Sequence, residues 1–562
     1  MRRLKICLIL LLAAVLLCAC QSGSEAPSAD IAACIASSDT SLFGIPVCSK
    51  DDILALKETR RASQTLPDIH SVSENSTLPH NVPVAQNERT PTYYLPLDME
   101  DPAWDSITLT AGAALFLVSD DPLPEKADAL KNGHVFSLFI CGEQFYSEAK
   151  LICTGLPMLK IDLYDHTGKV LADTRIERSP ASKMCFSYYD ACDPATDTVS
   201  SAECFGTIHT RGGTSAKYDK HSFKFALYDN IGCTDPNNLA LCGLRYDDDW
   251  VLNAMYQEET KVRDMLAYDL WEDIGADHYG DGTVLGTRMR YVEVILGGKY
   301  WGLYGLCEPE DAKQFGISET SPGSVYKASS WVVPRVSEIR NAIVNDIPQV
   351  AEVEVKYPDL SPEVSRDAWK PFLDYIEITY ESSDFYFEQQ IGNIMDENNL
   401  ADFWIFLNVT VGRDNTFKNL YLSYREAVGR LLISPWDCDI SFGLNWGDGG
   451  HDSLHLYHEP KTFREILSMP VFRRYLQMDV NGFEKTIADR WKELRKDWLS
   501  AEEILCRAHA FRAQIEDSGA LNRNRKKWPK SGDATDISYI EEFVNFRIPF
   551  LDEYIGSMAD EP

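Results

Sequence analysis

Two polar clusters flank a pair of apolar runs between Gly412 and Ser441, in the stretch GRDNTFKNLYLSYREAVGRLLISPWDCDIS. An acid and an amide come first, and an acid pair, D-C-D, follows the second apolar run. Carboxylate and amide oxygens are ligands that Mg²⁺ takes from proteins, while water and phosphate oxygens complete its shell. Phosphoryl transfer uses such a metal together with an acid that positions or deprotonates the attacking hydroxyl. The residue types therefore indicate a divalent metal and a nucleotide phosphate.

The two apolar runs predict a β-hairpin that brings these clusters together. In antiparallel pairing of NLYLSY with RLLISPW, Asn419 lies opposite about Pro435. Asp437 then emerges beside the loop that carries Asp414. The spacing R-D-x-x-x-x-N, followed by a hairpin and an Asp, is also how protein kinases arrange their catalytic loop and metal-binding Asp. The alternative is that these residues only cap a helix and stiffen turns, because Asp and Asn are common in loops.

Six segments of the chain resemble the spore-coat protein H (CotH) kinase family. They are RGGTSAKYDKHSFKFAL, LNAMYQEETKVRDMLAYDLWEDIG, YVEVILGGKYWGLYGLCEPED, VYKASS, GRDNTFKNLYLSY and SPWDCDISFG, in the order found in that family. The resemblance covers roughly residues 200–560. It implies an α+β fold with an atypical, two-lobed kinase-like domain. It also implies a secreted kinase that uses ATP and Mg²⁺ or Mn²⁺ to phosphorylate protein side chains.

The resemblance assigns roles to the residues of the hairpin. Asp414 resembles the catalytic-loop aspartate, and Asp437 resembles the metal-binding aspartate that catalysis also requires. Asn419 is then a second metal ligand. Asp439 shares a face with Asp437 if the strand continues, and it could be the ligand instead. Cys438 stands between the two acids, where a larger apolar or aromatic residue is expected.

Further residues are candidates for binding ATP. Lys224 projects from an alternating strand and is expected to pair with phosphates, and Arg211 with the Gly212–Gly213 turn could cradle a phosphate. Glu308, at a hairpin end, could orient Lys224 or bind metal, and Lys327 in VYKA is another phosphate candidate. The structural alternatives are a solvated edge lysine, an arginine that bridges loops and a turn acid.

The N-terminus predicts export. A positive start, a short apolar run and the sequence LCAC occupy residues 1–20. This pattern resembles a bacterial lipobox, in which Cys20 is diacylated, and the alternative is an ordinary secretory signal. We therefore expect the mature protein on the extracytoplasmic face of the cell membrane, anchored by lipid.

Composition predicts three further regions. Residues 21–92 are rich in Ser, Pro, Asn and Thr and are expected to form a flexible stalk. Residues 93–180 are expected to form a small β-sandwich-like module, and residues 181–562 the kinase-like domain. Twelve cysteines follow Cys20, and Cys34/Cys48 is one pair close enough in sequence to join in an oxidising compartment.

The net charge and the absence of certain motifs exclude several classes of function. A formal charge of −32 argues against a nucleic-acid binder. The histidines of HDSLHLYHE lack the H-E-x-x-H spacing of a metalloprotease, and no G-x-S-x-G motif is present. We therefore expect a kinase that transfers the ATP γ-phosphoryl group to Ser or Thr of an extracytoplasmic protein, such as a spore-coat or surface protein. A basic, Ser-rich substrate would suit the acidic chain. The alternative is a catalytically inactive kinase-like lipoprotein that acts as an adhesin or scaffold.

Overall fold

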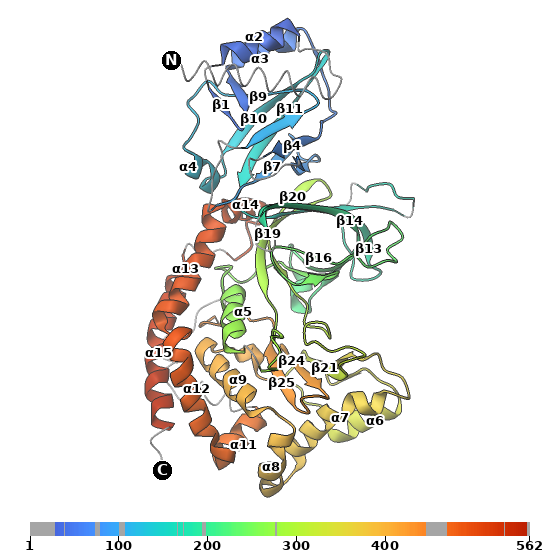
Figure 1. Cartoon of the computed structure of the whole chain (residues 1–562), viewed down its shortest axis with the longest axis vertical. Helices are drawn as coiled ribbons and strands as arrows, with labels where there is room; N and C mark the ends of the chain where they lie inside the picture. Colours follow the sequence, from blue (N-terminus) through green and yellow to red (C-terminus); the bar gives the residue numbers. More distant parts are fainter. Residues whose placement is uncertain are drawn as a thin grey trace. The chain divides into compact units, whose positions relative to one another are not determined.

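The structure is a computed structural model of the chain. It describes residues 28–38, 40–72, 79–99, 107–165, 167–171, 174–193, 198–275, 278–444, 469–532, 534 and 536–558. The chain divides into two compact units. Figure 1 draws its helices and strands, coloured along the sequence. The first unit comprises Met1–Asp249, Tyr291–Tyr304 and Gln514–Pro529, and the second comprises Trp250–Arg290, Gly305–Ala513 and Lys530–Pro562. Helices and strands are both abundant, which confirms the α+β class, whereas the two-lobed arrangement stays a prediction.

The first unit begins with an eight-stranded sheet in the order β1-β2-β9-β10-β11-β7-β6, with β3 paired to β11. Its strands are β1 (Ser41–Leu42), β2 (Ile45–Cys48), β3 (Arg61–Ala62), β6 (Val84–Ala85), β7 (Thr92–Pro96), β9 (Ala114–Val118), β10 (Val135–Cys141) and β11 (Phe145–Thr154). A three-stranded sheet contains β4 (Ile69–Val72), β5 (His80–Asn81) and β8 (Thr108–Ala111). The helices α2 (Ala29–Ser37), α3 (Lys50–Glu58) and α4 (Lys126–Lys131) accompany these strands.

The expectation of a flexible stalk over residues 21–92 is wrong for the part of that range that the structure describes. Helix α3 begins at a capping box in which Ser49 and Asp52 bind each other's backbone N–H groups. Ile31 of α2 and Ile53 of α3 are buried in a cluster with Phe116 of β9. The few apolar residues of these two helices recur at helical spacing, so each helix buries one face. The expected domain boundaries stay a prediction.

The rest of the first unit contains long antiparallel strands. β12 (Met158–Leu163), β13 (Ser182–Asp193), β14 (Thr198–Arg211) and β15 (Ser222–Tyr228) pair in chain order, and β12 also pairs in parallel with β19 (Met289–Leu296). β19 and β20 (Lys299–Cys307) flank Gly297 and Gly298, both at positive φ, as a two-residue hairpin turn requires. β16 (Leu239–Ala240), β17 (Tyr246–Asp247) and helix α14 (Ala520–Lys527) complete this unit.

A five-stranded sheet in the order β22-β23-β21-β24-β25 positions the candidate site in the second unit. Its strands are β21 (Gly323–Ala328), β22 (Gln349–Val350), β23 (Val353–Tyr357), β24 (Leu420–Arg425) and β25 (Leu431–Pro435). β24 and β25 form the predicted hairpin, but Leu420 rather than Asn419 lies opposite Pro435. The register therefore differs from the prediction by one residue. In the same unit, β18 (Asp249–Asn253) pairs with the end of β20.

Helix α9 (Glu397–Thr410) is the central helix of the second unit, and nearly all of its side chains are buried. It packs against α5 (Arg263–Ile274), α12 (Phe483–Asp497) and β25, with the ring of Trp271 on α5 at 5.8 Å from that of Phe403. The helix ends at Val411, which adopts a left-handed backbone conformation. The remaining helices are α6 (Val336–Val344), α7 (Ser365–Ile376), α8 (Asp384–Gln390), α11 (Pro470–Met478), α13 (Ala501–Asp517) and α15 (Ser538–Met558).

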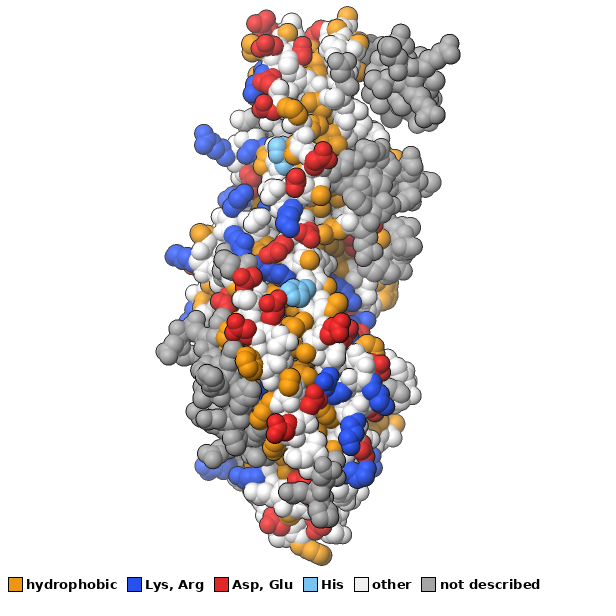
Figure 2. Space-filling view, turned by 90° about the vertical axis from the view of Figure 1, so that its left-hand side faces the viewer, with side chains coloured by type: hydrophobic (Ala, Val, Ile, Leu, Met, Phe, Trp, Pro, Cys, Tyr) orange, Lys and Arg blue, Asp and Glu red, His pale blue; other side chains and the backbone are white. Residues whose placement is uncertain are grey.

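Two surface properties bear on possible partners. Over the part of the chain that the structure describes, no helix has both the length and the apolar character that crossing a bilayer requires. The face drawn in Figure 2 intersperses acidic and basic side chains among apolar ones. This face is therefore mixed in sign, although the whole chain carries a formal charge of −32.

Candidate functional site

Asp414 lies in a short 3₁₀ turn, Arg413–Asn415, directly after the left-handed end of α9. Its side chain is only 2% exposed, and its Oδ2 accepts a hydrogen bond from Lys418 Nζ at 2.5 Å. The Lys418 ammonium also lies 4.4 Å from the ring centroid of Trp331. A buried carboxylate needs such a partner, because desolvation without one is costly. The hydrogen bond from Lys418 therefore holds the Asp414 carboxylate in place, and the same ammonium group has the charge to bind a phosphate.

The loop between Asp414 and β24 is tied to the end of β25. Asn415 Nδ2 donates to the carbonyls of Asn419 at 2.9 Å and Trp436 at 2.8 Å. Asn419 Nδ2 donates in turn to the carbonyl of Asp437 at 3.4 Å. The hairpin therefore brings Asn419 beside Asp437, although 18 residues separate them in the chain.

The two aspartates that follow β25 differ in exposure. Asp437 is exposed, has a left-handed backbone with φ of 57°, and donates its N–H to the hydroxyl of Tyr268 at 3.0 Å. Asp439 is partly buried. Burial raises the pKa of Asp439 well above its ordinary value, and the charges of Asp437, Asp264 and Asp414 add to that effect. These carboxylates therefore lie close enough together to oppose one another's ionisation.

Asp264, in the first turn of α5, belongs to the same acidic cluster. It is 3% exposed, and its Oδ2 accepts from Asn253 Nδ2 at 2.9 Å, whereas its buried Oδ1 has no hydrogen-bond partner among the residues that the structure describes. Burial, followed by the charges of Asp437 and Glu258, raises the pKa of Asp264 to about 8. Sequence reasoning missed this residue. The available signal was an R-D pair at a helix start inside one of the segments that resemble the CotH family.

This cluster has the donor chemistry that suits a hard divalent cation. No group of three His, Cys, Asp or Glu side chains within the described ranges is already arranged to hold a metal ion. The crowded acids nevertheless oppose one another's ionisation, and a bound cation would offset that repulsion and favour their ionised forms. Asp437, Asn419 and Asp439 stay the predicted ligands of Mg²⁺ or Mn²⁺.

Lys327, on β21, lies on the same sheet as the hairpin. Its Nζ is 5.5 Å from the ring centroid of Tyr421 and 5.9 Å from that of Trp436. Glu310 is 2% exposed and accepts a hydrogen bond from the Ser434 hydroxyl. Burial raises the pKa of Glu310 to about 8, while Ser434 and the charge of Lys327 act in the opposite direction. Lys327 therefore lies close enough to Glu310 for its positive charge to favour the ionised carboxylate. Sequence reasoning missed Glu310.

Glu308 has a different partner from the one expected. Its buried carboxylate accepts two hydrogen bonds from Arg288, at 3.0 Å from Nε and 2.7 Å from Nη2. Such a two-point pair fixes both side chains. Glu308 thus pairs with Arg288 and not with Lys224 as suggested from the sequence. An ATP-binding role for Glu308 stays a prediction.

Lys224 and Arg211 lie in the first unit, on paired strands. Lys224 Nζ is 3.5 Å from Asp249 Oδ2, and both side chains are partly exposed. Arg211 ends β14 and is followed by Gly212 at φ of 106°, where a Cβ would meet Ser215 Oγ at 2.1 Å. The Gly212 turn is thus real, but assignment of these two basic residues to ATP stays a prediction. Cys20 and the histidines of HDSLHLYHE lie outside the described residues.

Comparison with known proteins supports the resemblance. The family model described as CotH kinase protein matches residues 208–551, which is more than half of the 562-residue chain. No curated protein matches the chain. The matched range contains both the acidic cluster and the hairpin.

Proposed function

The chain belongs to the CotH kinase family, which assigns it ATP-dependent phosphotransferase activity, and on that premise we propose a specific reaction. The protein transfers the γ-phosphoryl group of ATP to a Ser or Thr hydroxyl of an extracytoplasmic protein. The observation that carries this proposal is the convergence of Asp414, Asn419 and Asp437 at one end of the β24–β25 hairpin.

Each residue has a role that its surroundings support. Asp414 accepts the proton of the attacking hydroxyl, and Lys418 holds its carboxylate in place. Asp437 and Asn419, with Asp439, hold Mg²⁺ or Mn²⁺. The metal, when bound, neutralises charge on the phosphate oxygens during transfer. Lys327 supplies a cation to the phosphates from its position beside the rings of Tyr421 and Trp436.

The cellular setting is also a proposal. The N-terminal pattern ending at Cys20 supports export and lipid anchoring on the extracytoplasmic face of the cell membrane. A spore-coat or surface protein rich in Ser and basic residues would complement the formal charge of −32. Electrostatic attraction of that kind increases the rate of encounter, and added salt weakens it.

The test is phosphoryl transfer by the purified full-length protein. γ-labelled ATP, Mn²⁺ or Mg²⁺ and candidate surface proteins are incubated with wild type and with D414N. Wild type should label a Ser or Thr side chain, and D414N should lose about a hundredfold or more in rate because the proton acceptor is gone. Binding of ATP without transfer in either protein would favour the inactive adhesin or scaffold instead.

A further inference from the structure

We propose that helix α5 positions the metal-binding segment through Tyr268 and Arg263. The segment is Asp437–Ser441, named here the acidic loop. Tyr268 fixes its first residue, and Arg263 fixes its last. This inference rests on the proposed function, because it assigns the acidic loop to a divalent cation.

Tyr268 holds the backbone of Asp437. The buried hydroxyl of Tyr268 accepts a hydrogen bond from the Asp437 N–H at 3.0 Å. The carbonyl of Asp437 accepts another from Asn419 Nδ2 at 3.4 Å. The left-handed backbone of Asp437 is unfavourable by roughly 1 kcal/mol for a residue with a Cβ. Two hydrogen bonds on either side of this Cα therefore maintain a conformation that the chain would otherwise leave. They set the direction in which the exposed carboxylate projects.

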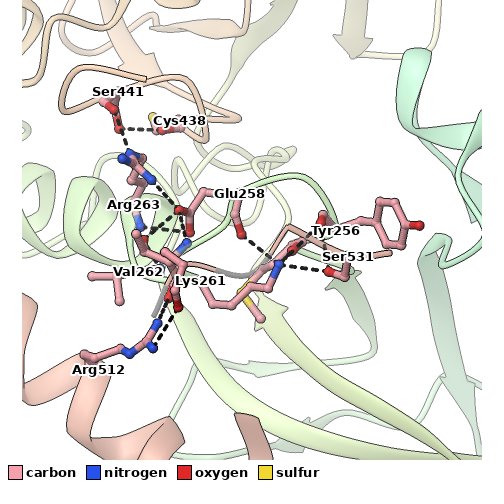
Figure 3. Close-up of polar contacts among 12 residues, drawn as sticks. Tyr256, Glu258, Lys261, Val262, Arg263, Cys438, Ser441, Arg512 and Ser531 are labelled. Carbon is pink, nitrogen blue, oxygen red and sulfur yellow. Dashed lines mark hydrogen bonds and ion pairs between the residues drawn. The ribbon is translucent and has the colours of Figure 1, made fainter. Parts of the chain in front are cut away.

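Arg263 holds the other end of the acidic loop (Figure 3). Its side chain is 0% exposed, and its Nε donates to the carbonyl of Ser441 at 3.0 Å. The Ser441 hydroxyl donates back to the carbonyl of Cys438 at 2.6 Å, so the loop is also closed on itself. Because α5 contacts both ends, the carboxylates between them cannot move freely relative to that helix.

A buried ion pair fixes the direction of the Arg263 side chain. Its Nη1 donates to Glu258 Oε1 at 2.6 Å, and the Glu258 carboxylate also accepts from the backbone and hydroxyl of Thr260. Burial acts to raise the pKa of Glu258, but the charges of Arg263 and Lys261 outweigh it, and the pKa is lowered. Glu258 is therefore a carboxylate that accepts hydrogen bonds from Arg263, and the pair resists rotation of the guanidinium.

The segment that carries Glu258 is itself anchored (Figure 3). Lys261, with a left-handed backbone, donates its buried ammonium to the carbonyls of Met255 at 2.7 Å and Glu258 at 2.8 Å, and to Ser531 Oγ at 2.9 Å. Arg512 Nη1 donates to the carbonyl of Thr260 at 3.1 Å. The segment that carries Glu258 and Arg263 is thus hydrogen-bonded to Arg512 and Ser531, in the C-terminal part of the second unit. Groups hydrogen-bonded to a metal ligand, as Tyr268 is to Asp437, commonly change metal affinity about 10–100-fold when they are removed.

The test measures Mn²⁺ binding to the full-length protein without nucleotide, by electron paramagnetic resonance titration. The variant Y268F removes only the oxygen that accepts the Asp437 N–H, and it should weaken Mn²⁺ binding about tenfold or more. The matched control is Y475F, which removes a buried hydroxyl that donates to Glu397 at 3.1 Å. It should bind Mn²⁺ like wild type while losing similar thermal stability.

A second variant, R263K, tests the same proposal independently in case Y268F does not fold. R263K keeps a positive charge near Glu258 but cannot reproduce the guanidinium fork that also reaches Ser441, so it too should weaken Mn²⁺ binding about tenfold. Wild-type affinity in Y268F and R263K, together with loss of binding in D437A, would overturn the positioning role alone. Equal weakening in Y268F and Y475F would overturn it as well. Wild-type affinity in D437A would instead overturn the proposed function.

Discussion

The burial of Glu310 should make the stability of the protein depend on pH in a way that E310Q removes. Its carboxyl is 2% exposed, and burial raises its pKa from 4.5 to about 8. The folded protein therefore holds this proton more tightly than the unfolded chain does between those values. The contribution of Glu310 to the free energy of unfolding is largest below about pH 4.5 and falls as the pH rises. It reaches its lowest value above about pH 8.

The size of the effect follows from the same shift. One pKa unit corresponds to about 1.4 kcal/mol, so the suppressed ionisation of Glu310 should lower the free energy of unfolding by about 2.5 kcal/mol more at pH 7 than at pH 5. Glutamine cannot ionise, and its amide oxygen can still accept the hydrogen bond from Ser434. The free energy of unfolding of E310Q relative to wild type should therefore rise by about 2.5 kcal/mol from pH 5 to pH 7.

The assay is urea unfolding of wild type, E310Q and a control at both pH values. The control is E426Q, which changes an exposed side chain directly after β24 and should follow wild type at both. Other titrating groups are common to the three proteins, so the difference between variants isolates Glu310. A constant difference between E310Q and wild type would refute the reasoning that burial suppresses ionisation here.

Three other perturbations separate the roles of individual side chains. K327M should weaken ATP binding by about 1.5–3 kcal/mol, measured by calorimetry, and unchanged affinity would remove Lys327 from the phosphate site. N415A should lower the free energy of unfolding by about 2 kcal/mol, because Asn415 Nδ2 donates to two carbonyls, and a smaller loss on urea unfolding would show that the loop re-forms. Cys34 and Cys48 have Sγ atoms 3.0 Å apart. In exported protein a disulfide oxidant should take two electrons and two protons from them, so non-reducing peptide mapping should find the linked pair, and free thiols would contradict it.

Sequence reasoning located the hairpin correctly, yet its register was off by one. Apolar alternation identifies the strands but not the residues that the turn consumes. The N–H of Val428 and that of Gly429 both donate to the carbonyl of Arg425, and Gly429 has φ of 71°. This turn extends to Arg430, which therefore precedes β25 rather than pairing with Tyr424.

The buried acids were harder to find than the strands. C-E-P-E-D offers three acids within four residues, and only the path of the chain after β20 sends Glu308 to Arg288 and Glu310 beneath Ser434. Asp264 looked like an ordinary first-turn acid, of the kind that favours a helix N-terminus. Its burial beside Asp437 depends on a contact between segments more than 170 residues apart, and local patterns carry no such information.

The position of a bound metal tests the central claim most directly. Crystals of the full-length protein with Mn²⁺ and a non-hydrolysable ATP analogue would locate the ion by its anomalous scattering. We expect a peak bounded by Asp437 and by Asn419 or Asp439, at about the 2.1 Å that small divalent cations take to oxygen. Phosphate oxygens should complete the shell, with Asp414 facing the γ-phosphate. An ion and nucleotide bound away from these side chains would contradict the account.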